Sequence, residues 1–321
     1  MKRILDKLLI AYSPMLKKKF LFFLFLIVII SSIATLIFYS FAIDITSKIP
    51  SYKNSTNNQL KKEKENIYVG VISRYPPNII FKGYQPIIDY LNTNPEYNFE
   101  LKLSTSYSET VDQLISGEVS VAFFGSLLYV NAHKRFGIIP VLKPLNEDFK
   151  PFFRSVLFTK KNSPINSVLE LKGKKIALPS KESFSGTWLI EYELKKYKLN
   201  QTDFAEIKNF PYHQNVIYQV INGNFDAGIV KDRVIKSYDE ENVKIIHLSE
   251  PVPGSPLVTA KNHDTKVIEI IKSLLLKIDL SKPYYKELVK NWDKEFIYGF
   301  VEASDADYDL IRKFSGAENQ W

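Results

Sequence analysis

The most constraining feature of the sequence is the segment from Phe20 to Ile43, in which no residue is charged. At about 1.5 Å per helical residue this segment spans about 36 Å, enough to cross a bilayer core with some tilt. Basic residues precede it, among them Lys17 to Lys19. The positive-inside rule then predicts one transmembrane anchor at residues 20–43, with residues 1–19 as a basic cytoplasmic segment.

A cleavable signal peptide is the alternative interpretation of this segment. Ser40-Phe41-Ala42 resembles the small-x-small pattern of a cleavage site. The apolar run is, however, longer than the h-region of about 7–15 residues in a usual signal peptide. We favour an uncleaved anchor, and the alternative stays open.

The composition is that of a globular protein, with 45% apolar, 14% aromatic and 24% charged residues. The formal net charge is +8, but the lysines are spread along the whole chain. We therefore expect a solvated surface and no nucleic-acid partner. The chain has no cysteine and only 4 histidines, which excludes disulfides and thiolate sites and argues against a transition-metal centre or a cofactor of that kind.

Residues 44–66 are rich in Ser, Asn, Lys and Gln and are predicted to form a flexible tether. From Ile67 onward, short β-rich runs alternate with amphipathic helical stretches, which indicates an α/β fold. The expected strands are 67–73, 99–104, 120–124, 138–142, 155–159, 174–178, 205–210, 225–230 and 243–248. The expected helices are 84–92, 108–116, 127–134, 187–197, 214–222 and 265–278, followed by a helical tail over 284–314.

An internal repeat suggests two similar lobes. The segment from Tyr107 to Ala122 aligns without a gap on the segment from His213 to Gly228. Each copy starts with a polar ring-bearing residue, continues as an amphipathic helix, and ends at a Gly followed by a strand. The pattern is also compatible with two unrelated β-α-β units. If the lobes are related, Tyr107 and His213 both lie at helix N-termini, at the sheet edge where open α/β folds bind ligands.

The sequence Ser183-Phe184-Ser185-Gly186-Thr187 lies between an expected strand and an expected helix. Hydroxyl groups and unpaired backbone N–H groups at a helix N-terminus can hold an anion without any arginine. The same residues could equally form an ordinary N-cap. Motifs of the common hydrolases, zinc proteases and phosphate-binding loops do not occur, so we expect a binding protein and not an enzyme.

The chain resembles the phosphonate, phosphate and phosphite-binding proteins of ABC transporters, the PhnD-like family of type 2 periplasmic binding proteins. The likeness covers nearly all of residues 67–279. Its most specific part is the Ser-x-Ser-Gly turn followed about thirty residues later by His213. Further matches are Gly117 to Gly125, Ser155 to Ile165, Leu169 to Ala177, and Pro253 to Leu257.

The resemblance implies a ligand site made of hydroxyl and amide groups from the turn, the later histidine, a tyrosine of the first lobe and an aromatic residue before a Gly. The corresponding residues here are Tyr107, Phe124, Ser183, Ser185, Gly186, Thr187 and His213. Two departures remove a donor each, because Phe184 stands where the family often has a hydroxyl residue and Phe124 where it often has Tyr. We therefore expect a more apolar pocket and a ligand with an apolar group or with fewer acceptor oxygens, which argues against inorganic phosphate.

The prediction is a two-lobed type 2 periplasmic-binding-protein fold after one transmembrane helix. Lobe one comprises about 67–154 and 257–321, lobe two about 155–250, with crossovers near Phe152–Val156 and Glu250–Leu257. The resemblance implies a monomer in the bacterial cytoplasmic membrane that captures a small phosphonate-like oxyanion outside it for an ABC permease. The alternative function is a sensing domain that reports to a signalling partner in the membrane.

Overall fold

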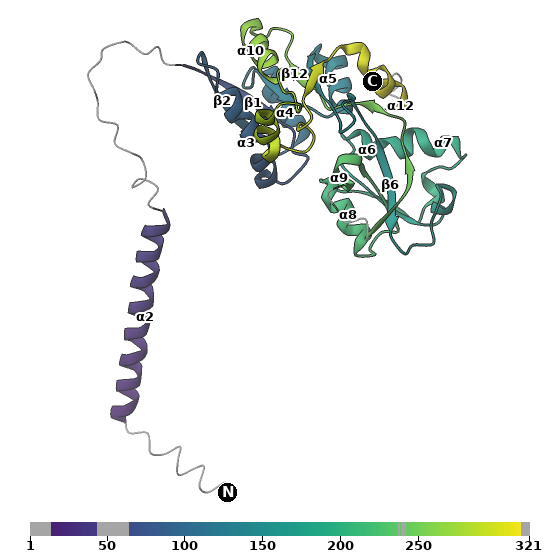
Figure 1. Cartoon of the computed structure of the whole chain (residues 1–321). Coiled ribbons are helices and arrows are strands. Elements are labelled where there is room, and N and C mark those ends of the chain that lie inside the picture. The colour runs from purple at the N-terminus through teal and green to yellow at the C-terminus, as the bar shows by residue number, and fades with distance from the viewer. Residues whose placement is uncertain (1–13, 44–63, 237, 239–241, 316–321) are drawn as a thin grey trace, which may run out of the picture. The chain divides into compact units, whose positions relative to one another are not determined.

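The computed structural model describes residues 14–43, 64–236, 238 and 242–315. The chain divides into two compact units, residues 1–62 and 63–321. In the first unit, helix α2 covers Pro14–Ile43 (Figure 1). Side chains of this helix are described for residues 19 and 22–36, and the apolar ones among them are exposed, as Phe22 is at 68%.

Where the structure describes the chain, no helix is both long and apolar enough to span a membrane. The predicted transmembrane anchor therefore has no support from the structure. Most of the predicted basic segment and most of the tether, residues 1–13 and 44–63, lie outside the described residues.

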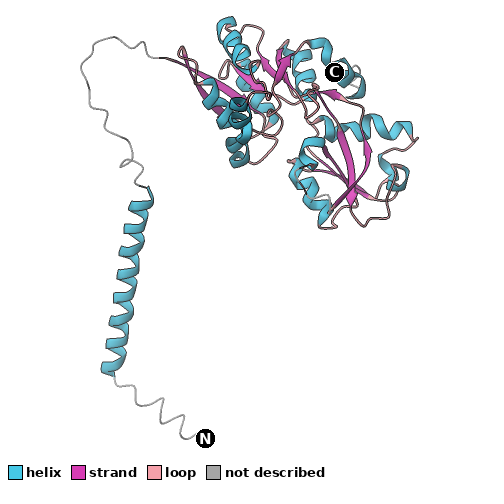
Figure 2. Cartoon of the chain, in the orientation of Figure 1, coloured by secondary structure: helices cyan, strands magenta, loops and turns pink. Residues whose placement is uncertain are grey.

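The second unit contains two mixed β-sheets, each flanked by helices (Figure 2). The first sheet has six strands in the order β13-β4-β12-β3-β1-β2. Strand β1 pairs in parallel with β2 and β3, whereas β12 runs antiparallel to β3 and β4, and β13 antiparallel to β4. The bounds are β1 Glu65–Val71, β2 Tyr97–Leu103, β3 Val121–Phe123, β4 Ile139–Pro144, β12 Leu257–Thr259 and β13 Phe300–Glu302.

The second sheet has five strands in the order β10-β6-β9-β7-β8. Strand β7 pairs in parallel with β8 and β9, and β6 pairs antiparallel with β9 and β10. Its central strand β9 is buried along its whole length, as expected for a strand covered on both faces. The bounds are β6 Ser155–Lys160, β7 Lys175–Leu178, β8 Glu206–Asn209, β9 Ala227–Lys231 and β10 Val243–Leu248.

The chain crosses between the two lobes through a small antiparallel pair of strands. Strand β5 (Phe152–Phe153) leads from the first sheet to the second, and β11 (Val252–Pro253) pairs with it on the way back. Both crossovers fall where the sequence predicted them. Two short adjacent segments are the usual construction of a hinge between lobes.

Helices cover both sheets. Around the first sheet they are α3 Pro77–Leu91, α4 Tyr107–Ile115, α5 Ser126–Phe136, α10 Thr265–Leu275, α11 Pro283–Leu288, η5 Val289–Asn291 and η6 Asp305–Tyr308. Around the second they are η2 Leu169–Leu171, α6 Phe184–Trp188, η3 Leu189–Glu193, α7 Leu194–Lys196, η4 Gln201–Asp203, α8 His213–Ile221 and α9 Asp232–Ile235. The last described helix, α12 (Asp309–Ser315), contacts both α5 and α6 and so touches both lobes.

Three sequence expectations differ from the structure. The tail is not wholly helical, because β13 interrupts it and pairs with β4. Helix α3 begins at Pro77, before the expected start at Tyr84, because Pro at the first helical position fits the helical φ. Helix α6 begins at Phe184, with Ser183 as N-cap, so the expected start at Thr187 was too late.

Candidate ligand-binding site

The internal repeat predicted from the sequence is present in the structure. Helices α4 and α8 each have nine residues and begin with Tyr107 and His213. The residue before each helix is extended, and each helix is followed by a Gly with φ of +78°, Gly117 or Gly223. The shared sequence pattern thus places one ring side chain at the start of a helix in each lobe.

A cavity of about 30 Å³ lies between the lobes, next to the β5/β11 crossover. Both lobes and both crossover segments contribute to its wall. This volume is close to one water molecule's share of liquid volume, far below the about 300 Å³ of the smallest pockets for drug-sized molecules. The lining residues are Ile72, Arg74, Tyr107, Gly125, Ser126, Phe153, Ser183, Phe184, Ser185, His213, Lys231 and Ser255.

The Ser183–Ser185 turn lines the cavity from the second lobe. The backbone N–H of Gly186 donates to the carbonyl of Ser183 at 2.9 Å, which closes the first turn of α6. Ser185 is buried, and its hydroxyl lies 2.8 Å from the hydroxyl of Ser155, at the start of β6. This contact fixes the position of the Ser185 side chain at the cavity wall.

Three of the predicted site residues do not line the cavity. Phe124 is buried in the hydrophobic core. Gly186 lies against the backbone, since a Cβ there would stand 2.0 Å from the carbonyl oxygen of Ser180. The hydroxyl of Thr187 donates to the carbonyl of Phe184 at 3.3 Å. Tyr107, Ser183, Ser185 and His213 are the predicted residues that the structure brings together at the cavity.

His213 is buried and neutral near pH 7. Burial, together with the positive charges of Lys231 and Arg74, lowers its pKa to about 3. The backbone N–H of Lys231 donates to Nδ1 at 3.4 Å. Because Nδ1 accepts, the proton of the neutral ring is on Nε2, which lies 3.4 Å from the hydroxyl of Ser183. His213 therefore offers the cavity one N–H donor.

Tyr107 is the corresponding donor of the first lobe. Its side chain is buried, and burial raises its pKa, with Arg74 acting in the opposite direction. The phenol therefore keeps its proton at neutral pH and can donate an O–H to a ligand.

The sequence analysis named no cation for the site, whereas Arg74 and Lys231 both line the cavity. Arg74 follows β1 and donates to the hydroxyl of Tyr84 at 2.7 Å and to Asp293 at 3.1 Å. Lys231 ends β9, donates to the hydroxyl of Ser255 at 2.9 Å and lies 4.0 Å from the centroid of the Phe153 ring. Both residues stand at the carboxyl end of a buried strand, and that position is the sequence signal that could have identified them.

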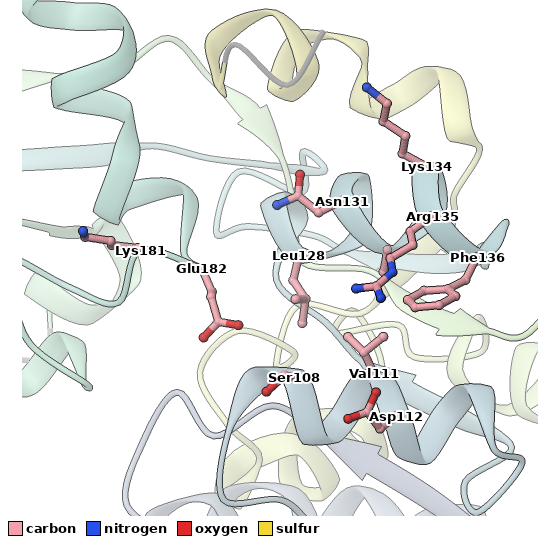
Figure 3. Close-up of a pocket in the computed structure, with 11 residues that line it drawn as sticks. Ser108, Val111, Asp112, Leu128, Asn131, Lys134, Arg135, Phe136, Lys181 and Glu182 are labelled. Atoms are coloured by element: carbon pink, nitrogen blue, oxygen red, sulfur yellow. The ribbon is translucent and has the colours of Figure 1, made fainter. Parts of the chain in front are cut away.

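A larger pocket of about 790 Å³ lies between α4, α5 and residues 181–182 of the second lobe (Figure 3). Figure 3 shows the carboxylate of Glu182 pointing into it. Although Glu182 is exposed, partial desolvation in this pocket raises its pKa. The pocket is lined by Ser108, Val111, Asp112, Leu128, Asn131, Ala132, Lys134, Arg135, Phe136, Lys181 and Glu182, so it contains no predicted site residue. In the described part of the chain, no group of three or more His, Cys, Asp or Glu could hold a metal ion.

Two α/β lobes, a double crossover and a polar cavity between them define a type 2 periplasmic binding protein. The chain belongs to the family described as the periplasmic substrate-binding protein of phosphonate ABC transporters, whose model matches residues 69–308. Proteins of this family are binding components of transporters, so the chain is a substrate-binding protein and not an enzyme.

Curated relatives agree with this assignment. The phosphate-import protein PhnD of Mycolicibacterium smegmatis is 25% identical over 72% of this chain and 78% of its own length. The phosphonates-binding periplasmic protein of Escherichia coli is 23% identical over 63% of each chain.

Solved structures show the same fold. PhnD1 from Prochlorococcus marinus, in complex with methylphosphonate, gives a TM-score of 0.70 at 19% identity, over 80% of this chain and 99% of its own. The binding protein of an ABC phosphonate transporter from Pseudomonas aeruginosa gives a TM-score of 0.67 at 18% identity, over 78% and 86%.

Proposed function

We propose that this chain is a membrane-anchored extracytoplasmic receptor that captures a small oxyanion, a phosphonate or a related phosphorus compound, for an ABC importer. One observation carries the proposal. Donors from both lobes, Tyr107 and Arg74 on one side and His213 on the other, meet at one buried cavity beside the crossover. A ligand that accepts from both sides stabilises the closed arrangement of the lobes.

The donor set suits phosphoryl oxygens. Ser183 and Ser185 supply hydroxyls, His213 an N–H, and Arg74 and Lys231 charged donors. Charged donors form shorter and stronger hydrogen bonds to an oxyanion than neutral donors do. The proposed ligand-contacting residues are therefore Tyr107, Ser183, Ser185 and His213 from the sequence, together with Arg74 and Lys231. Gly186 supports the turn by its close packing, and the hydroxyl of Thr187 stays at the helix.

An organic phosphonate fits the cavity better than inorganic phosphate. The ring of Phe184 is part of the wall, and so are Ile72 and Phe153. These side chains donate no hydrogen bond and would leave one oxygen of a phosphate ion without a partner. A methyl or another small alkyl group in that place contacts apolar carbon instead.

The anchor is proposed from the sequence alone. Residues 20–43 carry no charge, and Lys17 to Lys19 precede them. We propose a cytoplasmic segment 1–19, an anchor 20–43, a tether 44–66 and a monomeric binding domain 67–321 that works beside an ABC permease. No observation favours a signalling partner over a permease. Deleting residues 20–43 should move the chain from the membrane pellet to the soluble fraction, and an unchanged pellet would contradict the anchor.

Calorimetry of the purified chain tests the ligand class. Methylphosphonate and phosphite should bind, phosphate more weakly and a neutral sugar not at all. His213→Ala should weaken methylphosphonate binding by about 1–3 kcal/mol, the cost of one lost donor. His263→Ala is the matched control, because the contact of the His263 ring among the described residues is with the carbonyl of Ala260 in its own turn, and His263 does not line the cavity. Equal affinity in both variants would contradict the proposed site.

A further inference from the structure

Six charged side chains from both lobes gather beside the cavity. Arg74, Asp293 and Glu295 come from the first lobe, and Lys231, Asp232 and Arg233 lie at the junction of β9 and α9 in the second. We call this set the charge cluster. Arg74, Lys231 and Glu295 are each less than 10% exposed. Buried charges persist only when other charges compensate them, so the composition of the cluster determines what further charge the site accepts.

Glu295 is the shared counter-ion of the charge cluster. Its carboxylate accepts from Nη1 of Arg74 and from Nζ of Lys231, and the two bonds reach opposite lobes. Nη1 of Arg233 lies 3.7 Å from the same carboxylate and donates to the backbone carbonyl of Glu295 at 2.6 Å. One carboxylate therefore contacts both cations that line the ligand cavity.

The remaining acidic groups complete the balance. Asp293 accepts from Arg74 at 3.1 Å. Burial lowers the pKa of Lys231 and of Arg233, and the neighbouring carboxylate of Asp232 acts in the opposite direction on both. Three cations thus face three carboxylates, and the formal charge of the cluster is zero when all six are ionised.

Beyond Arg74 and Lys231, the described residues that line the cavity add no positive charge at neutral pH. His213 is neutral, and burial raises the pKa of Tyr75, Tyr84 and Tyr107, so these phenols keep their protons. Glu182, whose negative charge reaches Tyr107, is exposed. The cavity is therefore rich in hydrogen-bond donors but has no excess of positive charge.

We infer that this site selects an oxyanion with a single negative charge, and that Glu295 sets this preference by neutralising Arg74 and Lys231 in advance. The inference rests on the proposed oxyanion-binding function and specifies its substrate class. The cost of burying an ion grows with the square of its charge, whereas the same donors are present for either form. A dianion would therefore enter at about four times the desolvation cost of a monoanion without a second positive charge to meet it. Fitting ligands are singly protonated phosphonates, phosphonate monoesters and sulfonates.

The test is calorimetry of the purified full-length chain at several values between about pH 5.5 and pH 8.5, a range in which phosphoryl groups lose their second proton. Methylphosphonate changes from monoanion to dianion over this range. Methanesulfonate stays a monoanion throughout and reports any titration of the protein itself. The ratio of the two dissociation constants therefore isolates the charge of the ligand.

In the unmodified chain, the affinity for methylphosphonate relative to methanesulfonate should fall by about tenfold per pH unit above the second ionisation of the ligand. Glu295→Gln keeps the shape of the side chain and removes one negative charge from the charge cluster. The fall of the relative affinity for methylphosphonate with rising pH should therefore flatten or reverse. Asp293→Asn should act in the same direction and serves if Glu295→Gln does not fold. A relative affinity that stays constant or rises with pH in the unmodified chain would overturn the inference while leaving oxyanion capture intact. Absence of binding by both ligands at every pH would remove the proposed function as well.

Discussion

The hydroxyl of Ser183 and Nε2 of His213 lie 3.4 Å apart, across 30 residues of sequence. This separation is at the long end for a hydrogen bond, so the hydrogen bond between the two groups is weak and both can bind a ligand. An oxygen placed between them can accept from both. We propose that the pair forms two adjacent donors for an oxyanion, and it comes from the two segments that the sequence identified.

The buried His213 ring should make stability depend on pH. Its folded-state pKa is about 3, below the ordinary value of 6.5, so the unfolded chain binds more protons between these values. The stabilisation is complete above about pH 6.5 and is lost as the pH falls toward 3, amounting to about 2 kcal/mol between pH 6.5 and pH 5. Urea unfolding at several pH values should show that the free energy of unfolding falls less steeply with decreasing pH in His213→Gln than in the unmodified chain. Parallel curves would contradict the buried neutral ring.

Ser155→Ala should lower the free energy of unfolding, although Ser155 does not line the cavity. The reason is that the Ser155 hydroxyl lies 2.8 Å from that of Ser185 and both side chains are buried. Either single Ser→Ala change leaves one buried hydroxyl without this partner and should cost about 1–2 kcal/mol of unfolding free energy. The double variant should cost less than the sum of the two, since no orphaned hydroxyl remains. Thermal unfolding of the four proteins gives this comparison, and additive losses would rule out the coupling.

Gly186→Ala should disrupt the turn that carries Ser183 and Ser185. A Cβ at this position would lie 2.0 Å from the carbonyl oxygen of Ser180, and backbone must move to accommodate it. We expect a loss of at least about 2 kcal/mol in unfolding free energy. Gly125→Ala is the control, because its Cβ would meet nothing closer than 3.6 Å. Similar melting temperatures for the two variants would show that the close contact is unimportant.

Glu295→Ala should be among the most destabilising single changes near the site. It removes a 3% exposed carboxylate and leaves Arg74 and Lys231 buried without it, at a cost of about 3–5 kcal/mol. Glu147→Ala breaks an ion pair with Lys236 in which both side chains are about half exposed, so its cost should stay below about 1 kcal/mol. Denaturant unfolding measures both, and equal losses would refute the distinction.

Much of the fold and four of the six proposed ligand-contacting residues could be predicted because their signals are local. The alternation of strands and helices, the repeat that starts at Tyr107 and His213, and the Ser183–Ser185 turn are each continuous in the sequence. Strands β12 and β13 have only three residues each, too few to show an alternating pattern. Their pairing with β4 depends on segments far away in the chain.

The charge cluster could not be predicted from local patterns. Arg74 and Lys231 stand at the carboxyl ends of expected strands, but Glu295 is one among many charged residues and in sequence is indistinguishable from a solvated surface residue. Only the folded chain brings Glu295 to the other two, across 221 and 64 residues.

A crystal structure of the chain grown with methylphosphonate tests the central claim most directly. The claim predicts phosphonate oxygens at hydrogen-bond distance, about 3 Å, from Ser185, from Nε2 of His213 and from the hydroxyl of Tyr107, with both lobes in contact with one ligand. Density for the ligand in the pocket of Figure 3 instead, or an interlobe cavity that holds only water, would contradict it.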